Sequence, residues 1–285
     1  MSLLIEAHDV TKKYGSHTAL DRVSFSVASG RVVGLIGPNG AGKTSALRAI
    51  LGLTSYTGRL AVLGWEPFAN RAALMREASF IADVAVLPPW LRVDQAVDFV
   101  AAVHPLFRRD RALALLAKTG IGGRRRVREL SKGRKAQVHL ALTMAIDARL
   151  LVLDEPTLGL DILARRSFYD ALINDYMDDT RSIVVTTHQV EEIENLLTDV
   201  IFIDRGRVAL DTSVAAIAAN YAVLAVGDDR LAAARAEQPF FESRSLGKTL
   251  LYFERPKRDR LAVLGEVQTP SVADLFVAKL SRVGA

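Results

Sequence analysis

The chain carries a glycine-rich stretch, Gly37-Pro38-Asn39-Gly40-Ala41-Gly42-Lys43-Thr44, directly after the apolar run of residues 32–36. Residues 45–51, which follow it, read Ser-Ala-Leu-Arg-Ala-Ile-Leu and favour a helix. This order predicts a strand, a tight turn and the first turn of a helix. Glycine suits such a turn, because it lets the backbone bend without a Cβ clash and aims successive N–H groups into one concavity.

A concavity of this kind at the start of a helix is typical of a phosphate-binding P-loop. We expect its N–H groups to bind a polyphosphate, Lys43 to neutralise the β- and γ-phosphates, and the Thr44 hydroxyl to ligate Mg²⁺. The alternative, a plain connection between strand and helix, is disfavoured because the full pattern with both flanks is rare by chance. The predicted nucleotide-binding residues here are Gly37, Pro38, Asn39, Gly40, Ala41, Gly42, Lys43, Thr44 and Ser45.

The composition predicts a folded chain that does not span a membrane. Its 285 residues with 50% hydrophobic content suit one large domain, or a domain with an appendix. No apolar run approaches the ~20 residues of a transmembrane helix, and the first residues show no secretory signal. Because the chain has no cysteine, disulfides and thiolate metal sites are excluded, which fits a cytosolic protein. The net charge of +5 is mild and is explained equally well by a solvated surface.

Residues 3–29 predict antiparallel strands. Val23, Phe25 and Val27 alternate with small or polar residues, and this period of two places one face in the core. Residues 12–15, Lys-Lys-Tyr-Gly, are interpreted as a polar loop between the strands. Tyr14 in this loop either stacks on a base or covers a sheet edge, and the spacing alone favours neither.

A further strand is predicted at residues 79–82, and Asp83 follows it. Ligands of open α/β sheets gather at the carboxyl ends of strands, so Asp83 is a candidate site residue; an Asp that simply ends a strand is the competing interpretation. Residues 91–145 are predicted to be mainly helical. Ser131 begins the last helix of this region as its cap, and Lys132-Gly133-Arg134 make the same helix end attractive to an anion.

Two adjacent carboxylates, Asp154 and Glu155, follow the apolar run of residues 150–153, which predicts a strand buried on both faces. Carboxylates at such a position are costly unless a positive charge meets them. A Mg²⁺ held by Thr44 would meet this need, with Asp154 on the metal side and Glu155 taking a proton from an attacking water. Two carboxylates in a solvated loop are the alternative.

His188 follows a β-branched strand predicted at residues 183–187. A lone histidine is more often structural, but one at the end of a central strand is placed to reach phosphate. A β-hairpin at residues 200–210 closes the domain. Beyond residue 212 the pattern changes to a small α+β appendix that carries no motif of known chemistry.

Taken in this order, the segments resemble the ATP-binding subunit of a bacterial ABC transporter of the exporter-like branch. The resemblance covers roughly residues 3–212, with residues 37–44 as the Walker A loop and residues 150–155 as the Walker B strand. It implies ATP and Mg²⁺ as cofactors and an α/β fold, a P-loop NTPase of ABC type with an antiparallel β subdomain, a helical subdomain and a small C-terminal α+β appendix. The expected domains are an ABC ATPase domain at 1–212, its helical subdomain at about 84–145, and an accessory region at 213–285.

The remaining motifs follow the same resemblance. Residues 158–161 resemble the family's D-loop, and His188 corresponds to its switch histidine, which would act in catalysis with Glu155. Tyr14 corresponds to the aromatic residue that stacks on adenine. Residues 130–134 stand where the family has its LSGGQ signature, so the predicted signature residues are Ser131, Lys132, Gly133 and Arg134.

Three positions depart from the family pattern. Lys132 replaces the usual Gly and Arg134 the usual Gln. A side chain at Lys132 crowds a place where backbone meets nucleotide, although its charge can itself contact phosphate. Asp83 stands where the Q-loop glutamine is expected; it is shorter and negative, but it can still reach Mg²⁺ or water.

The resemblance implies two kinds of partner. Two such domains pack head to tail around two ATP molecules, so that Ser131 and Gly133 complete the site of a second copy or of a homologous ATPase subunit. A transmembrane permease subunit would contact residues 84–105 and receive the movement. The expected location is therefore cytoplasmic, peripheral on the inner face of the cell membrane. Residues 270–278 resemble a terminal helix of bacterial exporter ATPases, which favours export.

Two other protein classes are alternatives to a transport ATPase. A soluble ABC ATPase acting on nucleic acid would be expected to have a long coiled coil, cysteine zinc modules or a second cassette, and the sequence has none of these, so no nucleic acid is expected as a partner. A nucleotide-binding regulator with weak turnover is suggested by Asp83 and the altered signature.

Overall fold

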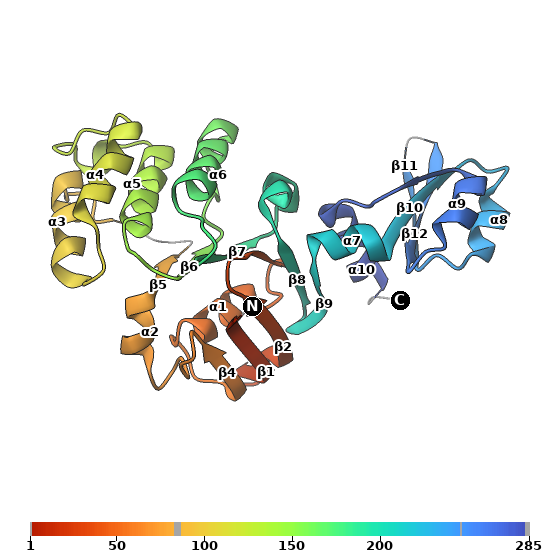
Figure 1. The fold of residues 1–285 in the computed structure, drawn as a ribbon, viewed down its shortest axis with the longest axis horizontal. Coiled ribbons are helices and arrows are strands. Elements are labelled where there is room, and N and C mark those ends of the chain that lie inside the picture. The colour runs from red at the N-terminus through yellow and green to blue at the C-terminus, as the bar shows by residue number, and fades with distance from the viewer. Residues whose placement is uncertain (1, 83–86, 246, 283–285) are drawn as a thin grey trace.

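The computed structural model describes residues 2–82, 87–245 and 247–282. The strands of these ranges form three sheets. A group of helices lies at one end of the molecule, and a small sheet with helices of its own lies at the other (Figure 1). None of the helices in the described ranges is long and apolar enough to cross a membrane.

A six-stranded sheet lies at the centre, in the order β5-β6-β7-β3-β8-β9. All strands run parallel except β9, which pairs antiparallel with β8. Every residue of β3, β6 and β7 is buried, because one face of the sheet packs against helices and the other against the N-terminal sheet. The strands are β3 (Val32–Ile36), β5 (Ala78–Ile81), β6 (Leu150–Asp154), β7 (Ser182–Thr187), β8 (Asp199–Asp204) and β9 (Arg207–Ser213).

The predicted antiparallel strands at the N-terminus are confirmed. They are β1 (Leu3–Tyr14), β2 (His17–Ala28) and β4 (Thr57–Val62), in the order β2-β1-β4. The polar loop expected at residues 12–15 is wrong: β1 continues to Tyr14, which pairs with His17. The chain turns only at Gly15, whose φ of +59° suits glycine. The adjacent charged residues Lys12 and Lys13 make the end of this strand look like a loop in the sequence.

The helical region predicted for residues 91–145 is also confirmed, and it contains α3 (Val93–Val103), α4 (Arg109–Lys118) and α5 (Lys132–Met144). Two other helices pack near the central sheet: α1 (Lys43–Ile50) follows β3, and α6 (Ile162–Asp175) follows β6 and packs against α5. The short α2 (Arg71–Glu77) leads into β5.

The α+β pattern expected beyond residue 212 has a defined topology. Its sheet has the order β11-β12-β10-β13, and the chain runs β-α-β-β-α-β, the split βαβ arrangement. Helices α8 and α9 cover one face of this sheet with their own small core. Helices α7 and α10 lie between this unit and the central sheet (Figure 1). The elements are α7 (Val214–Asn220), β10 (Tyr221–Val226), α8 (Leu231–Ala236), β11 (Phe241–Ser245), β12 (Lys248–Glu254), α9 (Arg258–Leu264), β13 (Glu266–Gln268) and α10 (Val272–Arg282).

Candidate active site

The glycine-rich stretch forms the turn between β3 and α1 that the sequence predicts. Gly42 caps the helix with φ of +111°, which a residue with a side chain rarely adopts. A Cβ at Gly42 would lie 2.5 Å from the Ala19 carbonyl oxygen, and one at Gly37 would lie 2.3 Å from that of Ile203. Both positions therefore require glycine, and the free N–H groups at the start of α1 remain available to an anion.

Lys43 is buried, with 6% of its surface exposed. Its ammonium group donates hydrogen bonds to the carbonyl oxygens of Gly37 at 2.7 Å and Pro38 at 3.3 Å. It also lies 3.4 Å from Oε1 of Glu155. The lysine of the P-loop and the second carboxylate after β6 are thus in direct contact, although 112 positions separate them in the sequence, from 43 to 155.

Asp154 is held at the end of β6 by two hydroxyl groups. Thr186 of β7 donates to its Oδ1 at 2.7 Å, and Thr44 donates to the same atom at 3.4 Å. Because Asp154 is 4% exposed, this carboxylate needs such partners. Hydroxyl and carboxylate oxygens, such as those of Thr44 and Asp154, are the ligands that Mg²⁺ prefers.

A metal ion at this place would need further ligands. In the described ranges, no three His, Cys, Asp or Glu side chains lie close enough together to hold a metal by themselves. Mg²⁺ usually takes one or two protein oxygens and completes its shell with water and substrate phosphates. Thr44 and Asp154 fit that pattern, with the remaining ligands coming from a nucleotide.

Glu155 and His188 meet at the carboxyl ends of the neighbouring strands β6 and β7. Nδ1 of His188 lies 2.8 Å from Oε2 of Glu155. The backbone N–H of Glu155 donates to the Thr186 hydroxyl at 3.0 Å, and its φ is +47°, in the left-handed region. The carboxylate is thus fixed from three directions, by Lys43, His188 and its own strained backbone.

Lys43, Glu155 and His188 line a cavity of about 540 Å³. Tyr14, which is 43% exposed, also lines it. Burial alone would raise the pKa of the Tyr14 hydroxyl, but hydrogen bonds with Ser45, Thr54 and Arg48 outweigh it, so the pKa is lowered. The lining residues are Tyr14, His17, Ala19, Pro38, Asn39, Gly40, Ala41, Gly42, Lys43, Thr44, Ser45, Glu155, Leu158 and His188.

The four signature residues do not line this cavity. Ser131 caps α5, where its hydroxyl accepts a hydrogen bond from the Arg134 N–H at 3.3 Å, as the sequence predicts. The side chain of Lys132 extends over Gly159, so that a Cβ on this glycine would lie 2.1 Å from the lysine ammonium nitrogen. Within one chain, the signature therefore contacts the predicted D-loop and not the P-loop.

Asp83, the remaining candidate, lies outside the described residues. The sequence reasoning also missed Thr186, which bonds to both Asp154 and Glu155. Its only signal is its position in a β-branched strand next to β6, and threonine in a strand is usually a packing residue.

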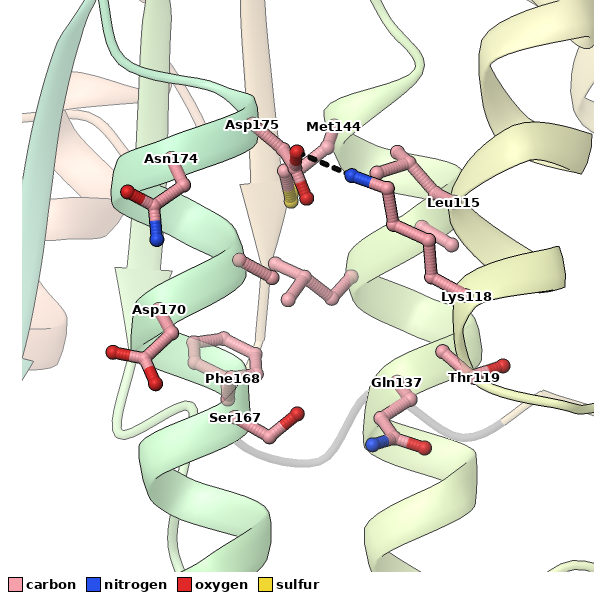
Figure 2. Close-up of a pocket in the computed structure, with 13 residues that line it drawn as sticks. Leu115, Lys118, Thr119, Gln137, Met144, Ser167, Phe168, Asp170, Asn174 and Asp175 are labelled. Atoms are coloured by element: carbon pink, nitrogen blue, oxygen red, sulfur yellow. Dashed lines mark hydrogen bonds and ion pairs between the residues drawn. The ribbon is translucent and has the colours of Figure 1, made fainter.

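A second hollow, of about 350 Å³, lies between α6 and the helices α4 and α5 (Figure 2). Its walls include Phe168, Leu115 and Met144, and an ion pair of 2.6 Å between Lys118 and Asp175 spans it. None of the predicted site residues lines it. The candidate active site is therefore the P-loop cavity.

The chain is similar to known proteins. The family profile described as "ABC transporter" matches residues 20–158. The chain is 33% identical over 219 residues to the Nod factor export ATP-binding protein I of Cupriavidus metallidurans, which covers 73% of this chain and 70% of that protein. It is 30% identical over 212 residues to the lantibiotic transport ATP-binding protein SrtF of Streptococcus pyogenes, covering 73% of this chain and 90% of that protein.

A solved structure of an ATP-binding subunit of an ABC transporter is similar to 75% of this chain. The TM-score is 0.68 at 26% identity, and the match covers 91% of the solved chain. The chain therefore belongs to the ABC transporter family, as an ATP-binding subunit that hydrolyses ATP for transport.

Proposed function

We propose that the chain binds MgATP in the P-loop cavity, closes around it with a second ATPase subunit, and drives export through a separate transmembrane permease. One observation carries the proposal: Lys43, the pair Asp154-Glu155 and His188 come from three separate segments and meet at the carboxyl ends of strands of the central sheet. This is the edge at which ligands of open α/β sheets bind.

Each residue then has a defined task. Lys43 exchanges its carbonyl and carboxylate partners for the β- and γ-phosphate oxygens when ATP enters. Thr44 and Asp154 hold Mg²⁺, which neutralises phosphate charge when bound, and Asp83 is a further candidate ligand from its position after β5. Tyr14 stacks on the adenine base at the open side of the cavity.

Hydrolysis depends on Glu155 and His188. Glu155 accepts a proton from the attacking water, and His188, 2.8 Å away, orients this carboxylate and contacts the terminal phosphate. Because the Thr186 hydroxyl bonds to the Asp154 carboxylate and to the Glu155 N–H, it keeps the two acidic residues in one arrangement.

The second subunit is a copy of this chain or a homologous one. Ser131, Lys132, Gly133 and Arg134 lie outside their own P-loop cavity and would complete the cavity of that partner. Ile162 and Leu163, next to the predicted D-loop, are 82% and 81% exposed. Exposed apolar side chains of this size mark contact surfaces, and we assign these two to the ATPase dimer.

The permease would bind at the helical region, which we propose spans residues 84–145 of an ATPase domain at 1–212, followed by the accessory region at 213–285. Trp90, Phe99 and Val103 are 67%, 64% and 62% exposed there. Such a permease would hold the chain on the inner face of the cell membrane. The relatives named for Nod factor export and lantibiotic transport favour export as the direction.

Co-purification tests the proposal. The tagged chain, extracted from native membranes in mild detergent, is expected to carry a multi-span membrane protein, and Trp90→Ser with Phe99→Ser to lose it. The matched control is Val263→Ser, an exposed apolar position in the accessory region. Recovery of the chain without any membrane protein would contradict the proposed partner.

A further inference from the structure

The C-terminal helix α10 returns from the accessory region to the ATPase core. Val272 and Leu275 are 1% and 0% exposed and belong to the same hydrophobic core as the central sheet. The ring of Phe276 packs edge-on against Phe202 of β8, with centroids 5.2 Å apart. Positions three and four apart share one face of a helix, so a single face of α10 makes all these contacts.

This face of α10 packs against what we name the switch segment, residues 188–197, which begins at His188. The segment consists of two short 3₁₀ turns, Val190–Glu192 and Glu194–Leu196, and α10 contacts the first of them. Val190 and Ile193 are 2% and 1% exposed and lie in the same core as Val272 and Leu275. Short 3₁₀ turns have little stability of their own, so their position depends on this packing.

A hydrogen bond ties the segment to the first turn of α10. Oε1 of Glu194 accepts it from the N–H of Val272 at 2.8 Å. An N–H in the first turn of a helix has no partner within the helix, and a carboxylate there also meets the positive end of the helix dipole. The bond therefore fixes where α10 begins relative to the segment.

The switch segment is also tied to α6 and to the active site. Arg165 of α6 donates a hydrogen bond to the Gln189 side chain at 2.8 Å and forms an ion pair with Glu192. His188, one residue before Gln189, lies 2.8 Å from Glu155. The active site and α10 therefore both contact the same short segment.

We infer that α10 is a positioning element for ATP hydrolysis: Phe276 anchors it on β8, and its contacts with Val190–Glu192 and the hydrogen bond from the Val272 N–H to Glu194 hold the switch segment so that His188 meets Glu155. The inference rests on the roles proposed above for His188 and Glu155. It gives the accessory region a task, because any displacement of the split βαβ unit that moves α10 changes turnover without touching the nucleotide.

The test is a double-mutant cycle on the purified full chain. Phe276→Ala and Glu194→Ala are each made alone and together with His188→Ala, and kcat and the Kd of ATP are measured. Each single change is expected to lower kcat about tenfold to a hundredfold, as a misplaced catalytic group does, while the Kd of ATP stays unchanged. In the His188→Ala background neither change should lower kcat further, because the imidazole that α10 positions is absent.

Two controls separate positioning from general damage. Glu194→Gln keeps an acceptor oxygen for the Val272 N–H and is expected to retain most of the turnover. Val277→Ala changes a 55% exposed residue of the same helix and should leave kcat unchanged. Because Phe276→Ala removes apolar contacts and can fail to fold, Glu194→Ala provides the same test without opening the core.

The outcomes are distinguishable. If the α10 variants lower kcat equally with and without His188, or keep wild-type kcat while His188→Ala loses it, the inference is wrong and the proposed function stands. If His188→Ala itself leaves kcat unchanged, the role of His188 fails and the inference fails with it. A rise in the Kd of ATP parallel to the loss of kcat would also contradict positioning.

Discussion

At the scale of single residues, Glu155 is the most constrained group of the site. Its φ of +47° costs about 1–3 kcal/mol for a residue with a side chain, and such strain persists only where the surroundings fix it. Those surroundings are Lys43 at 3.4 Å, His188 at 2.8 Å and the Thr186 hydroxyl at its N–H. The constraint is what a general base needs, because its carboxylate must face one water at a fixed angle.

Glu155→Gln is therefore expected to lower the rate of ATP hydrolysis by about a hundredfold or more, the loss typical of a missing general base. ATP binding should persist or strengthen, because Lys43 no longer pairs with a carboxylate. The measurement is phosphate release under saturating MgATP together with the Kd of ATP. A variant that turns over like the wild type would favour the nucleotide-binding regulator over the ATPase mechanism.

Lys132 replaces a glycine of the family signature and is exposed at the first turn of α5. Its charge at a helix N-terminus favours a phosphate of the partner's nucleotide, so Lys132→Met is expected to raise the KM for ATP about twofold to fivefold. Arg128→Met, at another exposed basic position, is the matched control. The difference in KM between Lys132→Met and the wild type should become smaller as the salt concentration rises. A KM unchanged by Lys132→Met at low salt would show that Lys132 does not contact phosphate.

At the scale of elements, the carboxyl ends of β3, β6 and β7 explain why the site forms. Parallel pairing in register places Ile36 beside Thr187, and Asp154 beside Thr186. The P-loop, the two carboxylates and His188 each lie where one of these strands ends.

Helix α5 covers the same sheet from one side. It carries a partly buried histidine, His139, and the stability of the folded chain therefore depends on pH.

Burial lowers the pKa of His139 from its ordinary value of 6.5. Below about pH 6.5 the unfolded chain therefore binds a proton at this residue that the folded chain does not, and the free energy of unfolding falls as pH decreases, by at most about 1.4 kcal/mol per pH unit. His139→Gln removes this contribution. The free energy of unfolding, measured with denaturant at pH 5.5 and at pH 7.5, should differ less between the two pH values for the variant than for the wild type. An equal difference in the two proteins would contradict the effect of burial on His139.

The elements that follow a clear pattern could be predicted from the sequence. The apolar run at residues 150–153 is a strand buried on both faces, and Ser131 is the cap of α5. The end of β1 could not be predicted from the sequence, because Lys12 and Lys13 are typical of a loop and this part of the strand is stabilised by pairing with β2. The pairing of Thr186 with Asp154, and of α10 with the switch segment, depends on tertiary packing between distant segments, which local periodicity does not encode.

At the scale of the whole molecule, two hydrophobic cores lie on opposite faces of the central sheet. Val33 and Leu35 of β3 point into the core shared with β1 and β2, and Val32 and Ile36 into the core shared with the helices. The nucleotide cavity lies at the carboxyl ends of β3, β6 and β7. The accessory region attaches to the helical side through α10, so its movements reach the active site by way of the switch segment.

The central claim is that Lys43, at the start of α1, and Asp154, at the end of β6, are brought together to bind one MgATP per chain. Calorimetric titration of ATP in the presence of Mg²⁺ tests it most directly, on the wild type, Lys43→Ala and the control Lys248→Ala, an exposed lysine of the accessory region. The account predicts one ATP per wild-type and control chain and no measurable binding by Lys43→Ala. Unchanged affinity in Lys43→Ala would contradict it.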